Sequence, residues 1–109
     1  MRSIDVKNLI SVYLKDSMIE YIVTLCEQTR RDPRILQGAS PRATLALTSL
    51  AKATAWIQGR DYVLPRDVNF IFSDCIEHRL IWTAELARSN DRFRVLGEIF
   101  DSVPAPAIR

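Results

Sequence analysis

The stretch Gln37–Ala43, which reads QGASPRA, decides how this sequence is interpreted. Ser40 followed by Pro41 is typical of a helix start, because serine caps free backbone N–H groups and proline suits the first helical position. Arg42 then takes the second helical position, where the partial positive charge of the helix end disfavours a cation. The pattern favours two explanations: an anion binds beside Arg42, or the side chain simply extends into water.

Upstream of this stretch, apolar spacing predicts a first helix that ends near Arg31. We expect its cap at Asp16 or Ser17, because Ser17 and Glu20 have the spacing of a capping box. Residues 32–39 are expected to form a loop. The buried face of the helix is expected to consist of Met18, Ile22, Leu25 and Cys26.

Downstream, the sequence predicts three more helices. The second runs from Pro41 to about Gln58, the third opens at Pro65 and fades by residues 79–81, and Ser89 or Asn90 caps the fourth. The expected inner faces are Ala43, Leu47, Leu50, Ala51, Thr54 and Ile57 in the second helix, Val68, Ile71, Phe72, Cys75 and Ile76 in the third, and Phe93, Leu96, Phe100 and Val103 in the fourth.

Short connections complete the expected organisation. Residues 4–14 are read as an extended lead-in with one short strand, residues 60–63 as an extended connection, and residues 82–88 as a link. The fold class is therefore predicted as all-α, a four-helix bundle with short extended connections. We expect one helical domain over residues 12–104, with residues 1–11 as a lead-in or a remnant of an expression vector and residues 105–109 as a frayed tail.

Composition and charge limit the classes of protein to which this chain can belong. The chain has 109 residues and a net charge of +2, too balanced to predict nucleic-acid binding from charge alone. Cys26 and Cys75 have no metal-ligand spacing and are expected to be buried free thiols, which fits a reducing, cytoplasmic compartment. No apolar run is long enough for a membrane helix, and the first residues do not resemble a signal peptide.

The side chains that could carry chemistry are few. His78 stands alone near a helix end and is expected to be structural, so no metal site is predicted. Arginines occur close together at Arg30, Arg31, Arg34 and Arg42, and solvated helix ends and a loop explain them. The carboxylates are expected to face outward: Glu20, Glu27, Asp67, Asp74 and Glu77.

A phosphate-binding glycine loop is absent from the sequence, so we do not expect this chain alone to hydrolyse a nucleotide. Arg42 is then the residue whose placement points to a ligand. Guanidinium suits phosphate, because it is always charged and can donate two parallel hydrogen bonds. Free N–H groups at the same helix start would add to the affinity for an anion.

Several short motifs together resemble one family. Gly38–Ala43 (GASPRA), Gly59–Val63 (GRDYV), Pro65 with Asp67–Val68, and His78–Leu80 (HRL) follow one another along the chain. In this combination they resemble the C-terminal lid of MoxR-type AAA+ ATPases. The likeness extends to Thr29-Arg30 and to Ser102-Val103-Pro104, and it covers roughly residues 12–104.

The resemblance implies a helical lid over a separate, N-terminal nucleotide-binding core that this chain lacks. It implies that Arg42 is the sensor-2 arginine, which contacts the phosphates of ATP, with Ala39, Ser40 and Pro41 in the same cofactor-binding element. Mg²⁺ is expected in the parent protein only, and no catalytic residue in this chain. Members of the family are chaperone-like ring oligomers, so neighbouring subunits and von Willebrand A-domain proteins are the expected partners.

The sequence departs from the family pattern at a few positions. Leu64 stands where a small capping residue is usual, and the run Phe70–Phe72 and Trp82 are bulkier than the pattern. A stand-alone helical interaction module without nucleotide function is the alternative reading. A helix-turn-helix that binds nucleic acid is disfavoured, because more than a tight turn separates the second and third helices.

Overall fold

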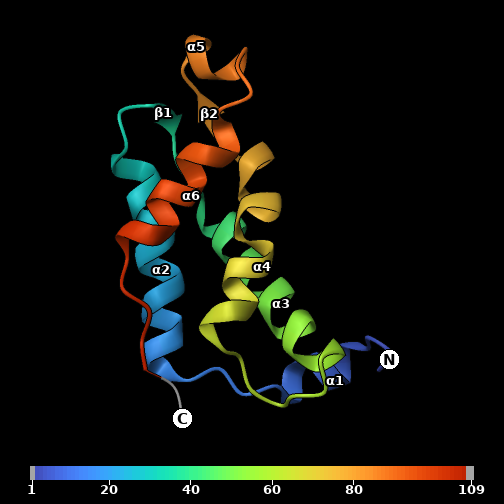
Figure 1. The fold of residues 1–109 in the computed structure, drawn as a ribbon. Coiled ribbons are helices and arrows are strands. Elements are labelled where there is room, and N and C mark those ends of the chain that lie inside the picture. Colours follow the sequence, from blue (N-terminus) through green and yellow to red (C-terminus); the bar gives the residue numbers. More distant parts are fainter. Residues whose placement is uncertain (1, 108–109) are drawn as a thin grey trace.

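The computed structural model describes residues 2–107 and is mostly helical, as predicted. Helices α2 (Asp16–Arg31), α3 (Pro41–Ile57), α4 (Pro65–Ile76) and α6 (Arg92–Ser102) are its long elements. They run roughly along the length of the molecule, with α6 beside α2 and α4 beside α3 (Figure 1). Within residues 2–107, every helix is too short or too polar to cross a membrane.

Short elements lie at the two ends of this assembly. Strands β1 (Ile35–Gln37) and β2 (Ile81–Trp82) pair antiparallel, with Ile35 opposite Trp82. They lie at the end opposite helix α1 (Val6–Ser11) in Figure 1. Because of this small sheet, the all-α four-helix class that the sequence predicted is confirmed only in that the chain is mostly helical. The turn η1 (Glu77–Arg79) and helix α5 (Ala84–Ala87) flank β2.

Two expectations for connecting segments are wrong. Residues 6–11 of the predicted extended lead-in form α1, because the Asp5 carboxylate accepts a hydrogen bond from the Lys7 N–H at 3.1 Å and caps a helical turn. Asp5 and Val12, on either side of α1, keep the expected extended backbone, and Tyr13 forms a parallel bridge to Tyr62. The predicted loop 32–39 contains β1, whose partner lies about 45 residues later and is invisible to local pattern reading.

The predicted caps of two helices are also wrong. The carbonyl of Lys15 accepts hydrogen bonds from the N–H groups of Met18 and Ile19, so α2 begins before Ser17 and the capping box does not form. Helix α6 begins after Asp91 rather than after Ser89 or Asn90. The Ser89 hydroxyl instead accepts from the Asp91 N–H at 3.1 Å, one step before the helix. Of the tail, residues 108–109 lie outside the described residues.

The core forms between the inner faces of the long helices. The whole predicted face of α2 is buried, as are Ala43, Leu47 and Ala51 of α3, whereas Leu50 is 42% exposed. Small alanines let α3 approach its neighbours closely. Of the face predicted for α6, Leu96 and Val103 are buried and Phe100 is partly buried against the core, but Phe93 is 50% exposed. Val95 and Ile99 are buried in addition.

A buried ion pair joins the loop after α3 to the start of α4. The Asp67 carboxylate is fully buried and accepts hydrogen bonds from the Arg60 guanidinium at 2.5 and 2.7 Å. It also accepts from the Leu64 N–H at 2.7 Å, so it caps the helix that Leu64 cannot cap. The expectation that Asp67 faces outward is therefore wrong. The hydrogen bonds to Asp67, and then its charge, raise the pKa of Arg60 above the ordinary value.

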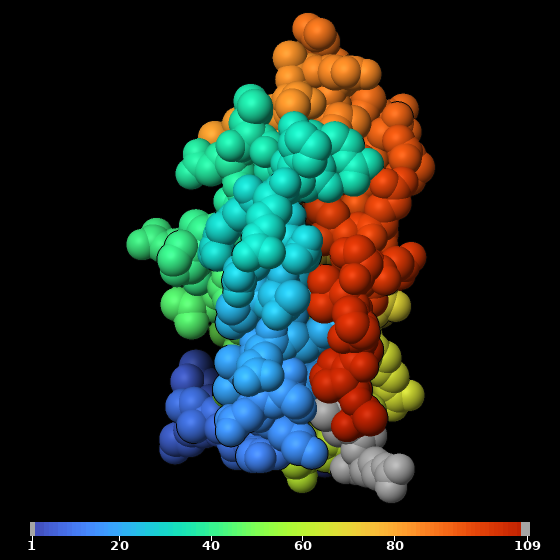
Figure 2. Space-filling model, turned by 90° about the vertical axis from the view of Figure 1, so that its left-hand side faces the viewer, coloured from blue at the N-terminus to red at the C-terminus, as the bar shows by residue number. Residues whose placement is uncertain are grey.

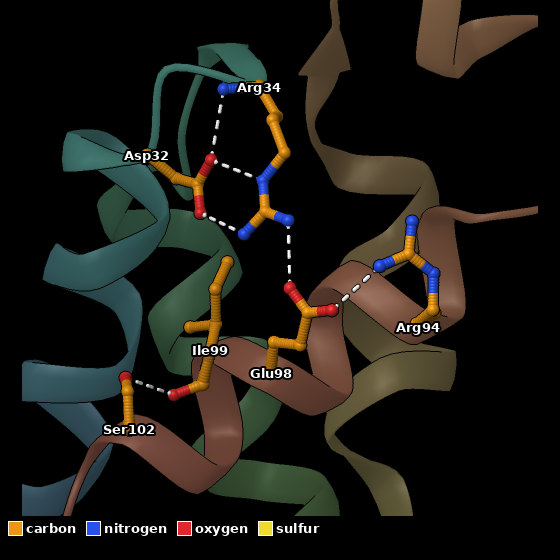
Figure 3. A network of polar contacts seen from close by, with 6 residues as sticks. All are labelled: Asp32, Arg34, Arg94, Glu98, Ile99 and Ser102. Atoms are coloured by element: carbon orange, nitrogen blue, oxygen red, sulfur yellow. Dashed lines mark hydrogen bonds and ion pairs between the residues drawn. The ribbon is translucent and has the colours of Figure 1, made fainter.

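A second polar network ties the segment after α2 to α6 (Figure 3). Arg34 donates to both Asp32 oxygens at 2.9 and 2.8 Å and to Glu98 at 2.8 Å. Glu98 also accepts from Arg94 at 2.7 Å. The hydrogen bonds from Arg34 lower the pKa values of Asp32 and Glu98 below their ordinary values. This network holds the base of β1 against α6.

Breaking the buried pair should be costly. We predict that Asp67→Asn lowers the free energy of unfolding by about 3–5 kcal/mol, because Arg60 then loses its counter-charge in a buried site. Asp74→Asn, at an exposed position on the same helix, is the matched control and should change little. Urea unfolding followed by circular dichroism measures both. Equal, small effects would mean that the pair contributes nothing beyond a surface charge.

We expect the Arg34 network to stabilise the fold when the pH is above the pKa values of Asp32 and Glu98, and to lose this effect when the pH is below them. A carboxyl whose pKa is lower in the folded state adds stability above its unfolded pKa and loses it as the pH falls through the folded value. The ordinary values are 3.8 for Asp32 and 4.5 for Glu98. We predict that wild type exceeds Arg34→Met in urea midpoint at neutral pH, and that this difference narrows once the pH falls below those values. A difference independent of pH would contradict the ionic account.

Candidate functional site

The last turn of α2 forms hydrogen bonds with the segment that leads into α3. Thr29 is completely buried; its hydroxyl donates to the Cys26 carbonyl at 2.5 Å and accepts from the Ala39 N–H at 2.9 Å. Arg30 donates from Nε to the Ala39 carbonyl at 2.7 Å. Both backbone polar groups of Ala39 are therefore held by two consecutive residues of α2, and this residue is itself buried.

Gly38 lets the two segments come this close. A Cβ atom built at Gly38 would lie 2.5 Å from the Cα of Arg30 and 2.6 Å from its backbone nitrogen. Such distances are shorter than van der Waals contact, so any side chain here would push the loop away from α2. Thr29, Arg30, Gly38 and Ala39 together form what we call the α2–α3 junction.

The junction leads directly into the predicted helix start. Ser40 is the N-cap of α3, and its hydroxyl accepts from the Ala43 N–H at 3.1 Å. Its carbonyl accepts the first helical bond, from the Thr44 N–H at 3.0 Å. Pro41 occupies the first helical position and Arg42 the second. The structure thus confirms the cap predicted at Ser40 and places Arg42 two residues beyond it.

The Arg42 side chain is exposed, and among residues 2–107 it makes no ion pair or side-chain hydrogen bond. Arg34, Arg60 and Arg92 are instead held in ion pairs of 2.8 Å or less. The first turn of α3 also contains no acidic residue. A free guanidinium thus stands at a helix end whose partial positive charge no carboxylate of that turn offsets.

Helix α4 offers an internal comparison. It too begins with a proline at its first position and an exposed arginine, Arg66, at its second. There, however, the next residue is Asp67, whose buried carboxylate receives the N–H of Leu64 and supplies the negative charge. The start of α3 lacks this compensation, so the two helix starts differ in what they can bind.

The neighbouring arginines have individual roles that their closeness in sequence does not reveal. Arg31 remains a solvated side chain, 3.8 Å from Glu27, in accord with the expectation for this cluster. Arg30 and Arg34 are used inside the fold and are not free for a ligand. Sequence reasoning did not predict that Thr29 and Arg30 bind the backbone of Ala39. The available signal was that both residues match the family pattern.

The other candidate residues add no chemistry to this site. Cys26 and Cys75 are buried free cysteines, as predicted, and burial is the main cause that raises the pKa of each thiol. Their thiols are therefore poor nucleophiles. His78 is exposed in the turn η1. Within residues 2–107, no three histidine, cysteine or acidic side chains gather as metal ligands would.

Apolar surface adjoins the helix start. An open, shallow depression beside it is lined by Val23, Arg30, Pro41, Thr44 and Leu45. In Figure 2 the first part of α3, in green, projects to one side of α2. The site is therefore an exposed arginine in the first turn of a helix that the junction holds in place. It is open to a partner and is not an enclosed pocket. It can contribute one wall of a phosphate site, and the rest must come from another surface.

Comparisons with known proteins identify the fold. A family model described as AAA lid domain matches residues 27–96. The uncharacterised protein YeaC of Bacillus subtilis is 33% identical over 100 residues, which cover 91% of this chain and 31% of that protein. Chaperone MoxR1 of Mycobacterium tuberculosis is 29% identical over 106 residues, covering 88% of this chain and 28% of the chaperone.

A solved structure agrees with these relatives. The crystal structure of a candidate ATPase from Cytophaga hutchinsonii superposes with a TM-score of 0.82 and 29% sequence identity. The match covers 93% of this chain and 34% of that one. This chain therefore spans about a third of the length of the relatives that it matches.

The close approach at Gly38 can be tested by adding one methyl group. We predict that Gly38→Ala lowers the free energy of unfolding by about 1–3 kcal/mol, because the new Cβ collides with the backbone of Arg30. The control is Gly97→Ala, in the middle of α6, where nothing lies within 4 Å of the added carbon. There alanine should stabilise the helix by up to about 1 kcal/mol. Urea unfolding that moves in the same direction for both variants would contradict the junction geometry.

Proposed function

We propose a function from the premise that this chain belongs to the AAA lid domain family, as the lid of a MoxR-type AAA+ ATPase. In its parent protein, the lid closes over an N-terminal nucleotide-binding core. Arg42 acts there as the sensor-2 arginine and contacts the phosphates of ATP that the core binds. Closing and opening of the lid then follow the state of the nucleotide.

The observation that carries this proposal is the state of Arg42. It is exposed, free of ion pairs within residues 2–107, and set at a helix end without a carboxylate in its first turn. These features fit a phosphate group, which accepts paired hydrogen bonds from guanidinium and is favoured by a helix N-terminus. ATP supplies the phosphoryl group that is transferred to water.

In this proposal the residues of the lid bind and position the nucleotide. Arg42 offers donors to a terminal phosphate, where a fixed cation stabilises charge that develops during transfer. Ala39, Ser40 and Pro41 set the direction from which it approaches. Because the junction fixes Ala39 to α2, displacement of the Arg42 backbone is tied to displacement of the lid as a whole. This is how the nucleotide and the lid become coupled.

The wider assembly follows from the family and belongs to the proposal. The parent protein would be a cytoplasmic, chaperone-like ATPase that uses Mg²⁺ at its core and works as a ring. Neighbouring subunits and von Willebrand A-domain proteins are then its partners. This part of the proposal is supported by the relative named chaperone MoxR1. The other relative, YeaC, is uncharacterised.

The central test compares Arg42→Ala with Arg66→Ala in the full-length parent protein. Both arginines are exposed and occupy the second position of a helix that starts with proline. We predict that Arg42→Ala lowers ATP turnover about a hundredfold, the usual effect of losing one charge contact in the transition state, and leaves helicity unchanged. Arg66→Ala should keep turnover near wild type.

Two results would contradict the proposal. If both variants turned over ATP equally well, Arg42 would be a surface arginine and the chain a helical interaction module. If Arg42→Ala unfolded the domain yet left turnover per folded molecule intact, its role would be structural. Circular dichroism and urea unfolding of each variant separate these cases.

A further inference from the structure

Helix α1 presents apolar side chains to solvent. No residue of this helix is buried, and Val6 and Ile10 are 72% and 73% exposed. With Leu9 they line an open depression that Ser49 and Lys52 of α3 complete. We call Val6, Leu9 and Ile10 the α1 face. Their spacing of three and four residues places them side by side on one side of the helix.

The α1 face is held in a fixed place. The indole N–H of Trp56 donates to the Ser3 carbonyl at 2.8 Å, and the Arg2 guanidinium lies 4.1 Å from the centre of that ring. Arg2 also pairs with Asp61 at 3.0 Å. These contacts tie the segment before α1 to the end of α3 and to the loop that follows it.

The segment after α1 is tied to the same loop. The Tyr13 N–H donates to the Asp61 carbonyl at 2.7 Å, and the Tyr13 carbonyl accepts from the Val63 N–H at 3.0 Å. An α-helix of six residues has too few hydrogen bonds to be stable alone, so packing must support it. Within residues 2–107, α1 packs against α3, Leu9 is half-buried, and Val6 and Ile10 remain exposed.

We propose that the α1 face is the surface through which this lid docks on the nucleotide-binding core of its parent protein. This rests on the proposed function. The relatives are about three times as long as this chain, and in the lid reading the core precedes it. In such a protein the core and the lid lie on the same polypeptide, and this tether raises their effective concentration for one another.

The chemistry of the α1 face points to an apolar patch on that core. The other large apolar side chains that are more than two-thirds exposed lie singly on separate elements: Leu36 in β1, Leu45 in α3 and Phe70 in α4. Single exposed apolar residues are normal on protein surfaces, whereas Val6 and Ile10 are adjacent and share a depression. Arg42 lies in the first turn of α3, whereas the α1 face adjoins Ser49 and Lys52 further along that helix, so the core would contact the lid at two separated places.

Hydrogen exchange in the 109-residue chain and in the full-length parent protein tests this docking. We expect the amides of residues 6–13 to exchange at least about tenfold more slowly in the parent, because docking suppresses local opening of a short helix. The double substitution Val6→Asp and Ile10→Asp should abolish this slowing in the parent. Phe70→Asp, an equally exposed apolar position on α4, is the control and should leave it intact.

Stability measurements guard against misfolding. In the 109-residue chain the double variant should keep the urea midpoint of the wild type, because both side chains are already exposed. Equal exchange of residues 6–13 in the chain and the parent would overturn the proposal. Slowing that survives the double substitution would place the docking surface elsewhere.

A concentration-dependent slowing in the 109-residue chain, lost in the double variant and absent from the parent, would make a second copy of the chain the occupant and overturn the proposal. The Arg42→Ala assay is independent of these outcomes. Docking can fail while turnover depends on Arg42, and docking can hold while it does not, so the two proposals fail separately.

Discussion

The candidate site depends on one constraint, the pair of hydrogen bonds between α2 and Ala39. Thr29 and Arg30 hold the N–H and the carbonyl of this one residue, and Gly38 removes the side chain that would keep the two segments apart. Ser40 and Pro41 follow immediately and set the axis of α3. An exposed arginine two residues later is therefore carried by the whole domain and not by a free loop.

The C-terminal end of α3 is also fixed by specific contacts. The Arg60–Asp67 pair joins the loop after α3 to α4, and Tyr13 binds that loop through its backbone. Helix α1 contacts α3, and the residues on either side of α1 are hydrogen-bonded to α3 and to this loop. A lid whose arginine and apolar face are both fixed to its helices is suited to being moved as one body, which is what the proposed nucleotide-driven closure requires.

The sequence predicted the parts of the fold that have a local cause. The cap at Ser40 and the buried face of α2 depend on residues within a few turns and were confirmed. Asp67 was misplaced because its partner, Arg60, lies across a loop, and a buried carboxylate is recognisable only once that partner is known. The pairing of β1 with β2 was missed for the same reason: strands this short carry no periodic signal.

The most direct measurement of the central claim is nucleotide discrimination by the full-length parent protein. Binding of a non-hydrolysable ATP analogue and of ADP would be compared by calorimetry in wild type and Arg42→Ala. If Arg42 contacts the terminal phosphate, the substitution weakens binding of the ATP analogue, by about tenfold or more for the loss of one charge-assisted contact, and leaves ADP binding nearly unchanged. An unchanged ratio of the two affinities would contradict the claim, and Arg42 would not be the residue that senses the nucleotide.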